Sequence, residues 1–573
     1  MRPAHAPAPV LHFALPLALL LACAEKSEAT GSGDTTEDTG DSEQIDVEVA
    51  DYELQLTVVV PQNQPDLFDI VSRVDLEISD KSGELGPFSF TDITSGGGEV
   101  ADGLPALTAA IFTIRAYDAD DALLAVGRSQ AVDATTGPQE VRVFMGRARS
   151  IGWLDPLQGE DGAERGVYSG ALVALGGGRF QLYGGTERVA FGPSPALAAD
   201  NGVWELDLND VDGGLRFERV GDIPPTAVDA AAPGRAAHTA TLLRGDHADD
   251  GLVLIAGGST DHLDTPNASK ALTLYDPSAH EVVADLELTS PIFLHSATVT
   301  SGGSVVFSGG SRPGPEGNNI SSSNRIQIFE PGSRTVSSVT VTDTPWMWEA
   351  TAPLRDGGVL LCGASIWGEG GPMEELKGCG LLTVGGSYTS RAALGISLPE
   401  ALFHPSMVTL ENGDVVLVGG LLDAGEGASP RYVADPRVWR LAEGATTWEP
   451  LGSLRIARGL ASVTLLPTGD LLVAGGVSSL ETQLFPDGDG AISCVERFII
   501  DAGVSKFVPA TVETVADEPA YDCDPGAVEG GLRQGAAQPL VALDPTDTNL
   551  LIVGGQGDSP PVSPEVAIYF PEL

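Results

Sequence analysis

The stretches VVLVGG (residues 415–420), LLVAGG (471–476) and LLIVGG (550–555) share one pattern, an apolar run that ends in two glycines. Seven such runs, one of them a near copy, are spaced along the chain at about 50 residues. Their end positions are Gly184–Gly185, Gly257–Gly258, Gly309–Gly310, Gly363–Ala364, Gly419–Gly420, Gly475–Gly476 and Gly554–Gly555. Self-similarity at this period is typical of a β-propeller, in which each repeat is one small sheet.

Each repeat predicts four short antiparallel strands. A strand of small residues opens the repeat, as in residues 460–466, and a polar turn such as Thr468-Gly469 leads into the apolar run. A third strand follows a variable loop, as in residues 203–208, and a weaker fourth strand contains Trp448. Four strands make one propeller blade, so we expect an all-β, seven-bladed ring in which the repeated glycines have a structural role.

The repeat resembles the kelch family of propellers over residues 149–573. The likeness lies in the opening strand with its His, the two glycines, the aromatic third strand and the Trp of the fourth strand. It departs from the family at Gly363–Ala364 and in the fourth strands that lack Trp. Kelch-type rings include a copper radical oxidase and sugar-acid epimerases, so the resemblance implies a propeller and leaves an enzyme as one alternative.

The two ends of the ring predict how it closes. The chain stops after a third strand at residues 566–573, so the last repeat lacks a fourth strand. Residues 150–157, with Trp153, lie before the first repeat and resemble the strand around Trp448. We expect residues 150–157 to pair with the last repeat, because a closed ring leaves no long unpaired sheet edge.

The residues before the ring predict three further parts. Residues 1–23 resemble a lipoprotein signal peptide, in which Leu20-Leu21-Ala22-Cys23 matches the lipobox and implies lipidation at Cys23. Residues 24–47 are acidic and lack aromatic side chains, which predicts a disordered linker. Residues 48–147 contain short alternating runs and predict a β-sandwich, Ig-like or prealbumin-like, before the propeller at 148–573.

The charge excludes some partners. The net charge is −49, from 80 acidic and 31 basic residues, and such a surface repels the phosphates of nucleic acid. We expect a monomer without a cofactor, held on the outer membrane or cell surface of a Gram-negative bacterium by its lipid anchor. A plain secreted protein remains the alternative.

Four cysteines other than Cys23 predict disulfides, because an even number in an exported chain is typical of cysteine pairing. They are Cys362, Cys379, Cys494 and Cys523. Pairing of 362 with 379 and of 494 with 523 is the local choice among three possibilities.

No catalytic, cofactor-binding or metal-binding residue is predicted. His238, His295 and His404 are expected at one equivalent position of three repeats, which favours a structural role over a metal site. We therefore expect a binding module for a protein or a glycan. Its contact surface is predicted on the loops at 186–201, 259–271, 311–324, 421–436 and 477–491. The alternative is a carbohydrate-active enzyme, a sugar oxidase or epimerase, that uses the same end of the ring.

Overall fold

The computed structural model divides the chain into two compact units. One contains residues 1–148, 208–214 and 572, and the other contains residues 149–207, 215–571 and 573. The residues that the structure describes are 10–14, 54–64, 67–80, 83–90, 107–134, 139–187, 199–210, 215–223, 234–259, 268–313, 320–343, 349–363, 365–366, 374–375, 377–425, 428, 431–480, 491–509, 532, 536–546, 548–556 and 562–571.

The smaller unit is built on one connected sheet with the strand order β1-β2-β8-β6-β5-β3-β4, and β7 pairs with β5. Its elements are β1 (Val10–Ala14), β2 (Leu54–Val59), α1 (Leu67–Ile70), β3 (Arg73–Asp80), β4 (Gly83–Phe90), β5 (Leu107–Tyr117), β6 (Leu123–Arg128), β7 (Val132–Ala134) and β8 (Gln139–Arg147). Buried side chains alternate along β3, and Leu76 and Ile78 pack with Phe112 and Val143 in the core.

This connected sheet differs from the prediction for residues 48–147. All its strands are linked by hydrogen-bonded pairing into one network, whereas a sandwich has two separate sheets, so the sandwich is not confirmed. Strand β1 pairs with β2 and falls inside the predicted signal peptide. Cys23 and the linker at 24–47 lie outside the described residues.

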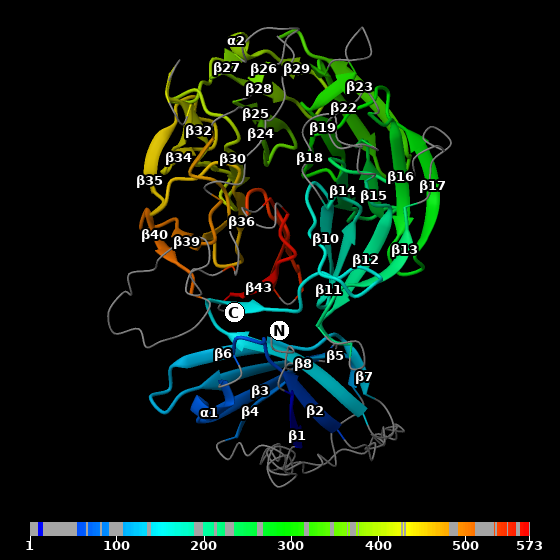
Figure 1. The fold of residues 1–573 in the computed structure, drawn as a ribbon, viewed down its shortest axis with the longest axis vertical. Helices are drawn as coiled ribbons and strands as arrows, with labels where there is room; N and C mark the ends of the chain where they lie inside the picture. The colour runs from blue at the N-terminus through cyan, green and yellow to red at the C-terminus, as the bar shows by residue number, and fades with distance from the viewer. Residues whose placement is uncertain are drawn as a thin grey trace, which may run out of the picture. The chain divides into compact units, whose positions relative to one another are not determined.

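The larger unit contains six sheets of four or more strands, arranged like the blades of a propeller (Figure 1). Five are four-stranded. These are β10 (Ala171–Gly176), β11 (Arg179–Tyr183), β12 (Gly202–Asp207) and β13 (Glu218–Asp222); β14 (Thr239–Leu242), β15 (Val253–Ala256), β16 (Ala271–Asp276) and β17 (Glu281–Glu287); β18 (Ser296–Val299), β19 (Val305–Ser308), β22 (Arg325–Glu330) and β23 (Thr335–Thr340); β24 (Ala350–Pro353), β25 (Val359–Cys362), β28 (Cys379–Leu382) and β29 (Tyr388–Thr389), followed by α2 (Arg391–Leu394); and β41 (Leu540–Leu543), β42 (Leu550–Val553), β43 (Val566–Phe570) and β9 (Ser150–Trp153).

The sixth of these sheets has eight strands. One half is β30 (Ser406–Thr409), β31 (Val415–Val418), β34 (Arg437–Leu441) and β35 (Glu449–Ser453). The other half is β36 (Ser462–Leu465), β37 (Leu471–Ala474), β39 (Val495–Ile499) and β40 (Val504–Phe507). A single residue pair, Ser453 with Val504, joins the two halves.

Three small sheets complete the unit, all formed by segments that follow second strands. Two are hairpins, β20 (Ser311–Pro313) with β21 (Ile320–Ser322) and β26 (Ser365–Ile366) with β27 (Glu374–Glu375). The third contains β32 (Leu421–Asp423), β33 (Tyr432–Ala434) and β38 (Ser479–Leu480).

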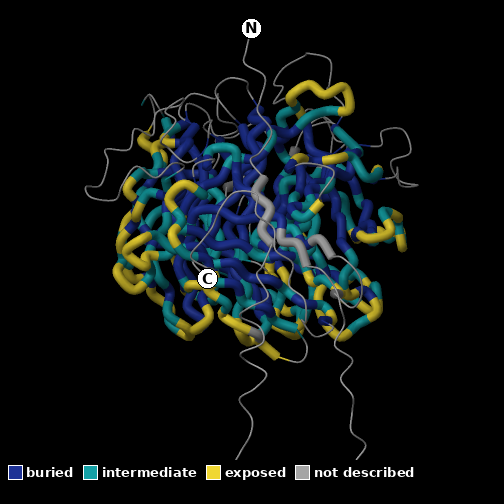
Figure 2. The backbone as a smooth tube through the Cα atoms, turned by 90° about the horizontal axis from the view of Figure 1, so that it is seen from below, coloured by how far each residue is buried: buried dark blue, intermediate teal, exposed yellow. Residues whose placement is uncertain are grey.

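Burial follows strand order within each blade-like sheet. Second strands such as β15, β19 and β31 are buried at every residue, because neighbouring sheets cover both of their faces. The outer strand β17 instead alternates exposed and half-buried residues. Buried and exposed segments are distinguished along the backbone in Figure 2. The continuous apolar runs in the sequence are therefore the second strands, whose two faces are both covered by neighbouring sheets.

The repeated glycines join each sheet to the next. The second glycine donates its N–H to a carbonyl that precedes the following sheet, as in Gly185 to Arg235 (2.8 Å) and Gly476 to Ala536 (2.7 Å). Gly555 donates in the same way to Val167, at 3.0 Å, which links the last sheet to the first.

The predicted closure of the ring is confirmed. Strand β9 pairs with β43 in antiparallel register, with Gly152 opposite Ile568 and Trp153 opposite Ala567. Ile151 is fully buried in the core cluster that also contains Tyr569. A segment from before the first sheet is therefore the outer strand of the last sheet.

The disulfide Cys362–Cys379 joins β25 to β28, whose two cysteines are direct cross-strand partners. This matches the local pairing expected from the sequence. Cys494 is also disulfide-bonded, and its predicted partner Cys523 lies outside the described residues. Disulfides are consistent with an extracytoplasmic protein.

Within the described ranges, the structure contains no helix with the length and apolar character needed to cross a membrane.

Candidate functional site

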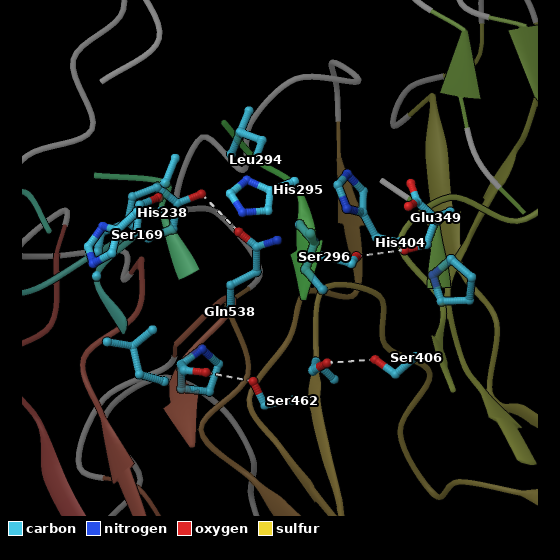
Figure 3. A pocket seen from close by; sticks show the side chains of 18 of the residues that line it. Ser169, His238, Leu294, His295, Ser296, Glu349, His404, Ser406, Ser462 and Gln538 are labelled. Carbon is cyan, nitrogen blue, oxygen red and sulfur yellow. Dashed lines mark hydrogen bonds between the residues drawn. The ribbon is translucent and has the colours of Figure 1, made fainter. Parts of the chain in front are cut away.

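A cavity of about 380 Å³ lies where the first strands of the sheets begin, within the larger unit. Figure 3 shows its lining side chains arriving from different strands around one space. The lining is Tyr168, Ser169, Gly170, Ala237, His238, Leu294, His295, Ser296, Glu349, His404, Pro405, Ser406, Leu460, Ala461, Ser462, Leu480, Gln538, Pro539 and Leu540. Because the first strands contact one another in a closed circle from β10 to β41, this axial cavity lies on the ring axis.

The axial cavity is lined by one short backbone segment per repeat. In six of these segments the residue two positions before the first strand has a left-handed backbone, with φ between 45° and 54°. These residues are Ser169, Ala237, Leu294, His404, Leu460 and Gln538. Left-handed backbone is uncommon for residues other than glycine, so the recurrence shows that this corner of the ring is fixed by the fold.

The type of side chain that follows the left-handed residue differs between the two sides of the cavity wall. The following residue is His238, His295 and Glu349 in three consecutive sheets, which we call the polar arc. In the other three sheets the equivalent residues are Gly170, Pro539 and, one in each half of the eight-stranded sheet, Pro405 and Ala461. The wall therefore has one side with ionisable groups and one with small or proline side chains.

This register corrects the prediction for the histidines. His238 and His295 are equivalent, but His404 lies one position earlier in its repeat, at the left-handed residue. The pairs Phe403–Leu421 and Phe293–Ser311 are equivalent in the two repeats. His404 therefore corresponds to Leu294, and Pro405 corresponds to His295. The prediction missed Glu349, which is the true equivalent of the two histidines, because the fourth repeat has Glu where the pattern has His.

The first glycine of three pairs, Gly184, Gly257 and Gly309, makes room for the polar arc. A Cβ on Gly257 would approach the ring of His295, and a Cβ on Gly309 would overlap the carboxylate of Glu349. The repeated glycines therefore have the expected structural role, and in these sheets they also hold cavity-lining side chains in place.

The three cavity histidines are uncharged at neutral pH. Burial lowers the pKa of His238 and His295 to about 3, and that of His404 to about 4. His295 forms a hydrogen bond through Nε2 with Thr239 Oγ1 of the preceding sheet, at 3.0 Å. Neutral imidazoles offer both a donor and an acceptor, so this part of the wall can bind polar groups without carrying charge.

Glu349 is 6% exposed and accepts a hydrogen bond from Ser308 Oγ at 2.7 Å. The charge of Arg391 lies near it, since Glu349 raises the pKa of that guanidinium while burial, the larger effect, lowers it. Arg391 is placed by donating through Nε to the carbonyl of Gly378. A buried carboxylate next to a cation is a strong hydrogen-bond acceptor on the cavity wall.

Several hydroxyl groups of the wall already have hydrogen-bond partners in a neighbouring repeat. Ser406 donates to the carbonyl of Ala461 at 3.0 Å, and Ser462 donates to the carbonyl of Pro539 at 2.6 Å (Figure 3). Tyr168 donates to Gln538 Oε1 at 2.9 Å, across the junction of the first and last sheets. These groups stabilise the ring, and the polar arc and His404 are left as the parts of the wall with chemistry to offer.

In the described part of the chain, no three His, Cys, Asp or Glu side chains gather closely enough to hold a metal ion. Cys362, Cys379 and Cys494 are bonded in disulfides, so none of them is available for a Tyr–Cys cross-link of the radical oxidase type.

The predicted contact loops lie largely outside the described residues. Their described parts include the small sheet β32-β33-β38, which packs on the start of the first strands through Tyr432, Leu480 and Phe403. Leu480 also lines the axial cavity. The described parts of the loops at 421–436 and 477–491 and the cavity therefore lie at one end of the ring.

Comparison with known proteins does not identify a family for this chain. No known family model matches the sequence, and no curated protein matches it. The solved structure of YjhT is similar to 62% of this chain and to 99% of its own length, at 13% identity and a TM-score of 0.40. That similarity is too low to bear on function.

Proposed function

We propose that the protein is a lipid-anchored, extracytoplasmic propeller of the kelch type that binds an uncharged glycan in the axial cavity. The observation that carries this proposal is the polar arc, which combines two neutral imidazoles and one carboxylate in a space of about 380 Å³. Small-molecule sites are concave, with a few placed polar groups among apolar ones, and their volumes start near 300 Å³. Sugar hydroxyls both donate and accept, which suits this set of partners.

We further propose seven blades. The eight-stranded sheet counts as two blades, because its halves share only the pair Ser453–Val504. Each half has the strand order of a four-stranded blade. The circle of contacts also passes through the first strand of each half, β30 and β36, as separate members.

The anchor rests on the lipobox resemblance at Cys23 and is supported by the disulfide Cys362–Cys379, which fits an oxidising compartment. The test is Cys23→Ala in the full chain, followed by membrane fractionation and mass analysis of the mature N-terminus. Loss of membrane association and of the acyl mass supports lipidation. An unchanged membrane fraction contradicts it.

The glycan proposal is tested by screening the full chain on a glycan array and measuring the best hits by calorimetry. Glu349→Gln keeps the side-chain size and removes the charge, and we expect at least tenfold weaker binding. The matched control is Glu411→Gln, on an exposed turn outside the cavity. Binding that is equal in both variants, with folding verified by circular dichroism, contradicts the proposal.

A carbohydrate-active enzyme, a sugar oxidase or epimerase, is the second candidate, because Glu349 and His404 share the cavity and both are acid–base group types. Incubation of the bound glycan with the protein distinguishes the two. Conversion of the sugar that stops in Glu349→Gln favours the enzyme, and recovery of unchanged sugar favours the binding module.

A further inference from the structure

A second cavity, of about 260 Å³, lies away from the ring axis at the seam between the last two repeats. Its lining includes Arg497 and Ile499 on β39, Lys506 and Val508 on and beside β40, and Tyr569 on β43. The seam is where the chain closes the ring, since β43 pairs with β9 and Ile151 donates its N–H to the carbonyl of Pro509.

The seam cavity is basic, although the chain as a whole is strongly acidic. Arg497 and Lys506 are direct cross-strand partners, so their side chains leave the same face of the sheet. Arg149 adds a third basic residue from the other side of the seam. Only 31 of the 573 residues are basic, which makes three of them around one cavity a marked local reversal of charge.

The two cross-strand basic residues differ in their partners, since Arg497 has a carboxylate neighbour and Lys506 has none among the described residues. Asp470 accepts a hydrogen bond from Arg497 Nε at 2.7 Å and forms an ion pair with its guanidinium. Lys506 is exposed, and the described residues provide it with no carboxylate partner. Lys506 therefore presents a positive charge to the cavity beside the Arg497–Asp470 ion pair, and an anionic group can contact it.

The floor of the seam cavity is apolar. Ile499 and Val508 lie on the same faces as the basic pair, two residues along their strands, and Tyr569 is 1% exposed. Phe507 also lines the cavity. A ligand that fits both parts carries one anionic group and a compact apolar body.

We propose that the seam cavity is a binding site for a small organic anion, a carboxylate, sulfate or phosphate on a ring or short apolar group. The anionic oxygens contact Lys506, and the apolar body packs against Tyr569 and Val508. This site is independent of the axial cavity and of the function proposed for it. The net charge of −49 repels anions in general, so binding here depends on the local basic group.

The test is calorimetry or ligand-observed NMR on the full chain at constant ionic strength. The probes are benzoate and phenyl phosphate, with inorganic phosphate and the uncharged benzyl alcohol as comparisons. We expect saturable one-to-one binding of benzoate or phenyl phosphate with a Kd of about 1 mM or below. Inorganic phosphate and benzyl alcohol are expected to bind at least tenfold more weakly.

Lys506→Gln is expected to weaken binding of the anionic probe by about tenfold, through loss of a charge-assisted contact. Lys377→Gln is the matched control, because Lys377 is an exposed lysine near Glu400 and outside the cavity. The proposal is overturned if neither organic anion saturates. Equal losses in the two variants, or benzyl alcohol binding as tightly as benzoate, also overturn it. Thermal unfolding shows whether each variant is folded.

Discussion

Two junctions between neighbouring sheets are built from the same glycine pair and differ in what the pair contacts. At Gly554 the first glycine packs against the backbone carbonyl of Val167. At Gly309 it packs against the side-chain carboxylate of Glu349. A backbone carbonyl that also accepts the N–H of Gly555 has no freedom to move, whereas a carboxylate can rotate. The first junction therefore supports the ring, and the second presents a group to the cavity.

The largest expected effect is at the backbone junction. Gly554→Ala adds a Cβ at φ 63° directly against a carbonyl, and we expect a loss of about 3 kcal/mol or more in the free energy of unfolding. Urea denaturation measures it. Gly469→Ala is the control, since Gly469 has a similar φ of 85° and no atom within 4 Å of the added Cβ. A control loss as large as that at Gly554 would remove the distinction.

The disulfide next to the side-chain junction gives the second effect. Cys362 and Cys379 close a loop of 17 residues in the sheet that follows Gly309. Replacing both with Ala is expected to cost about 3 kcal/mol, because the unfolded chain regains the entropy of the open loop. Denaturation of the double variant measures this cost. A loss below about 1 kcal/mol would show that the sheet is stable without its covalent link.

The third effect is a pH dependence carried by the cavity histidines. Their pKa is near 6.5 in the unfolded chain and about 3 to 4 when folded, so the unfolded chain binds more protons between these values. Stability is therefore expected to fall as pH decreases from about 6.5 toward 4, by up to about 1.4 kcal/mol per pH unit for each histidine.

The histidine effect is isolated by substitution. Denaturation of His238→Asn and His295→Asn between pH 7 and 4 should give a flatter dependence than the unaltered chain. Burial raises the pKa of Asp200 and of Asp249, but their Arg partners lower it, and the net shift is downward. These two carboxyl groups therefore change the free energy of unfolding mainly below pH 4. An unchanged slope in the histidine variants would show that other groups carry the pH dependence.

The smallest effect on stability is expected at the side-chain junction. Gly309→Ala strains the backbone at φ 60° and displaces the carboxylate of Glu349, which can move, so we expect a loss of only about 1–2 kcal/mol. Glycan affinity should nevertheless fall as it does in Glu349→Gln. Calorimetry with the best array hit checks this, and full affinity would mean that the position of Glu349 does not matter to the ligand.

The repeat and its closure could be predicted because they depend on local patterns. Apolar runs that end in Gly184, Gly419 or Gly555 specify strands and tight turns. Trp153 identified the strand before the first repeat that completes the last sheet. The histidine alignment failed by one residue at His404, because sequence similarity does not show where the left-handed corner falls. Glu349 was missed since its repeat matches the pattern least well.

The amino-acid sequence by itself determined the all-β class, the blade-like repeat and the acidic charge, because each follows from composition or from contacts within one repeat. It also determined the pairing of both ends, because the last repeat lacks a strand and residues 150–157 resemble the missing one. Only the tertiary structure decided that His238, His295 and Glu349 form one arc of a cavity, and that Arg149, Arg497 and Lys506 gather at the seam. Each of these groups combines residues from more than one repeat, and their proximity depends on how successive sheets pack around the axis.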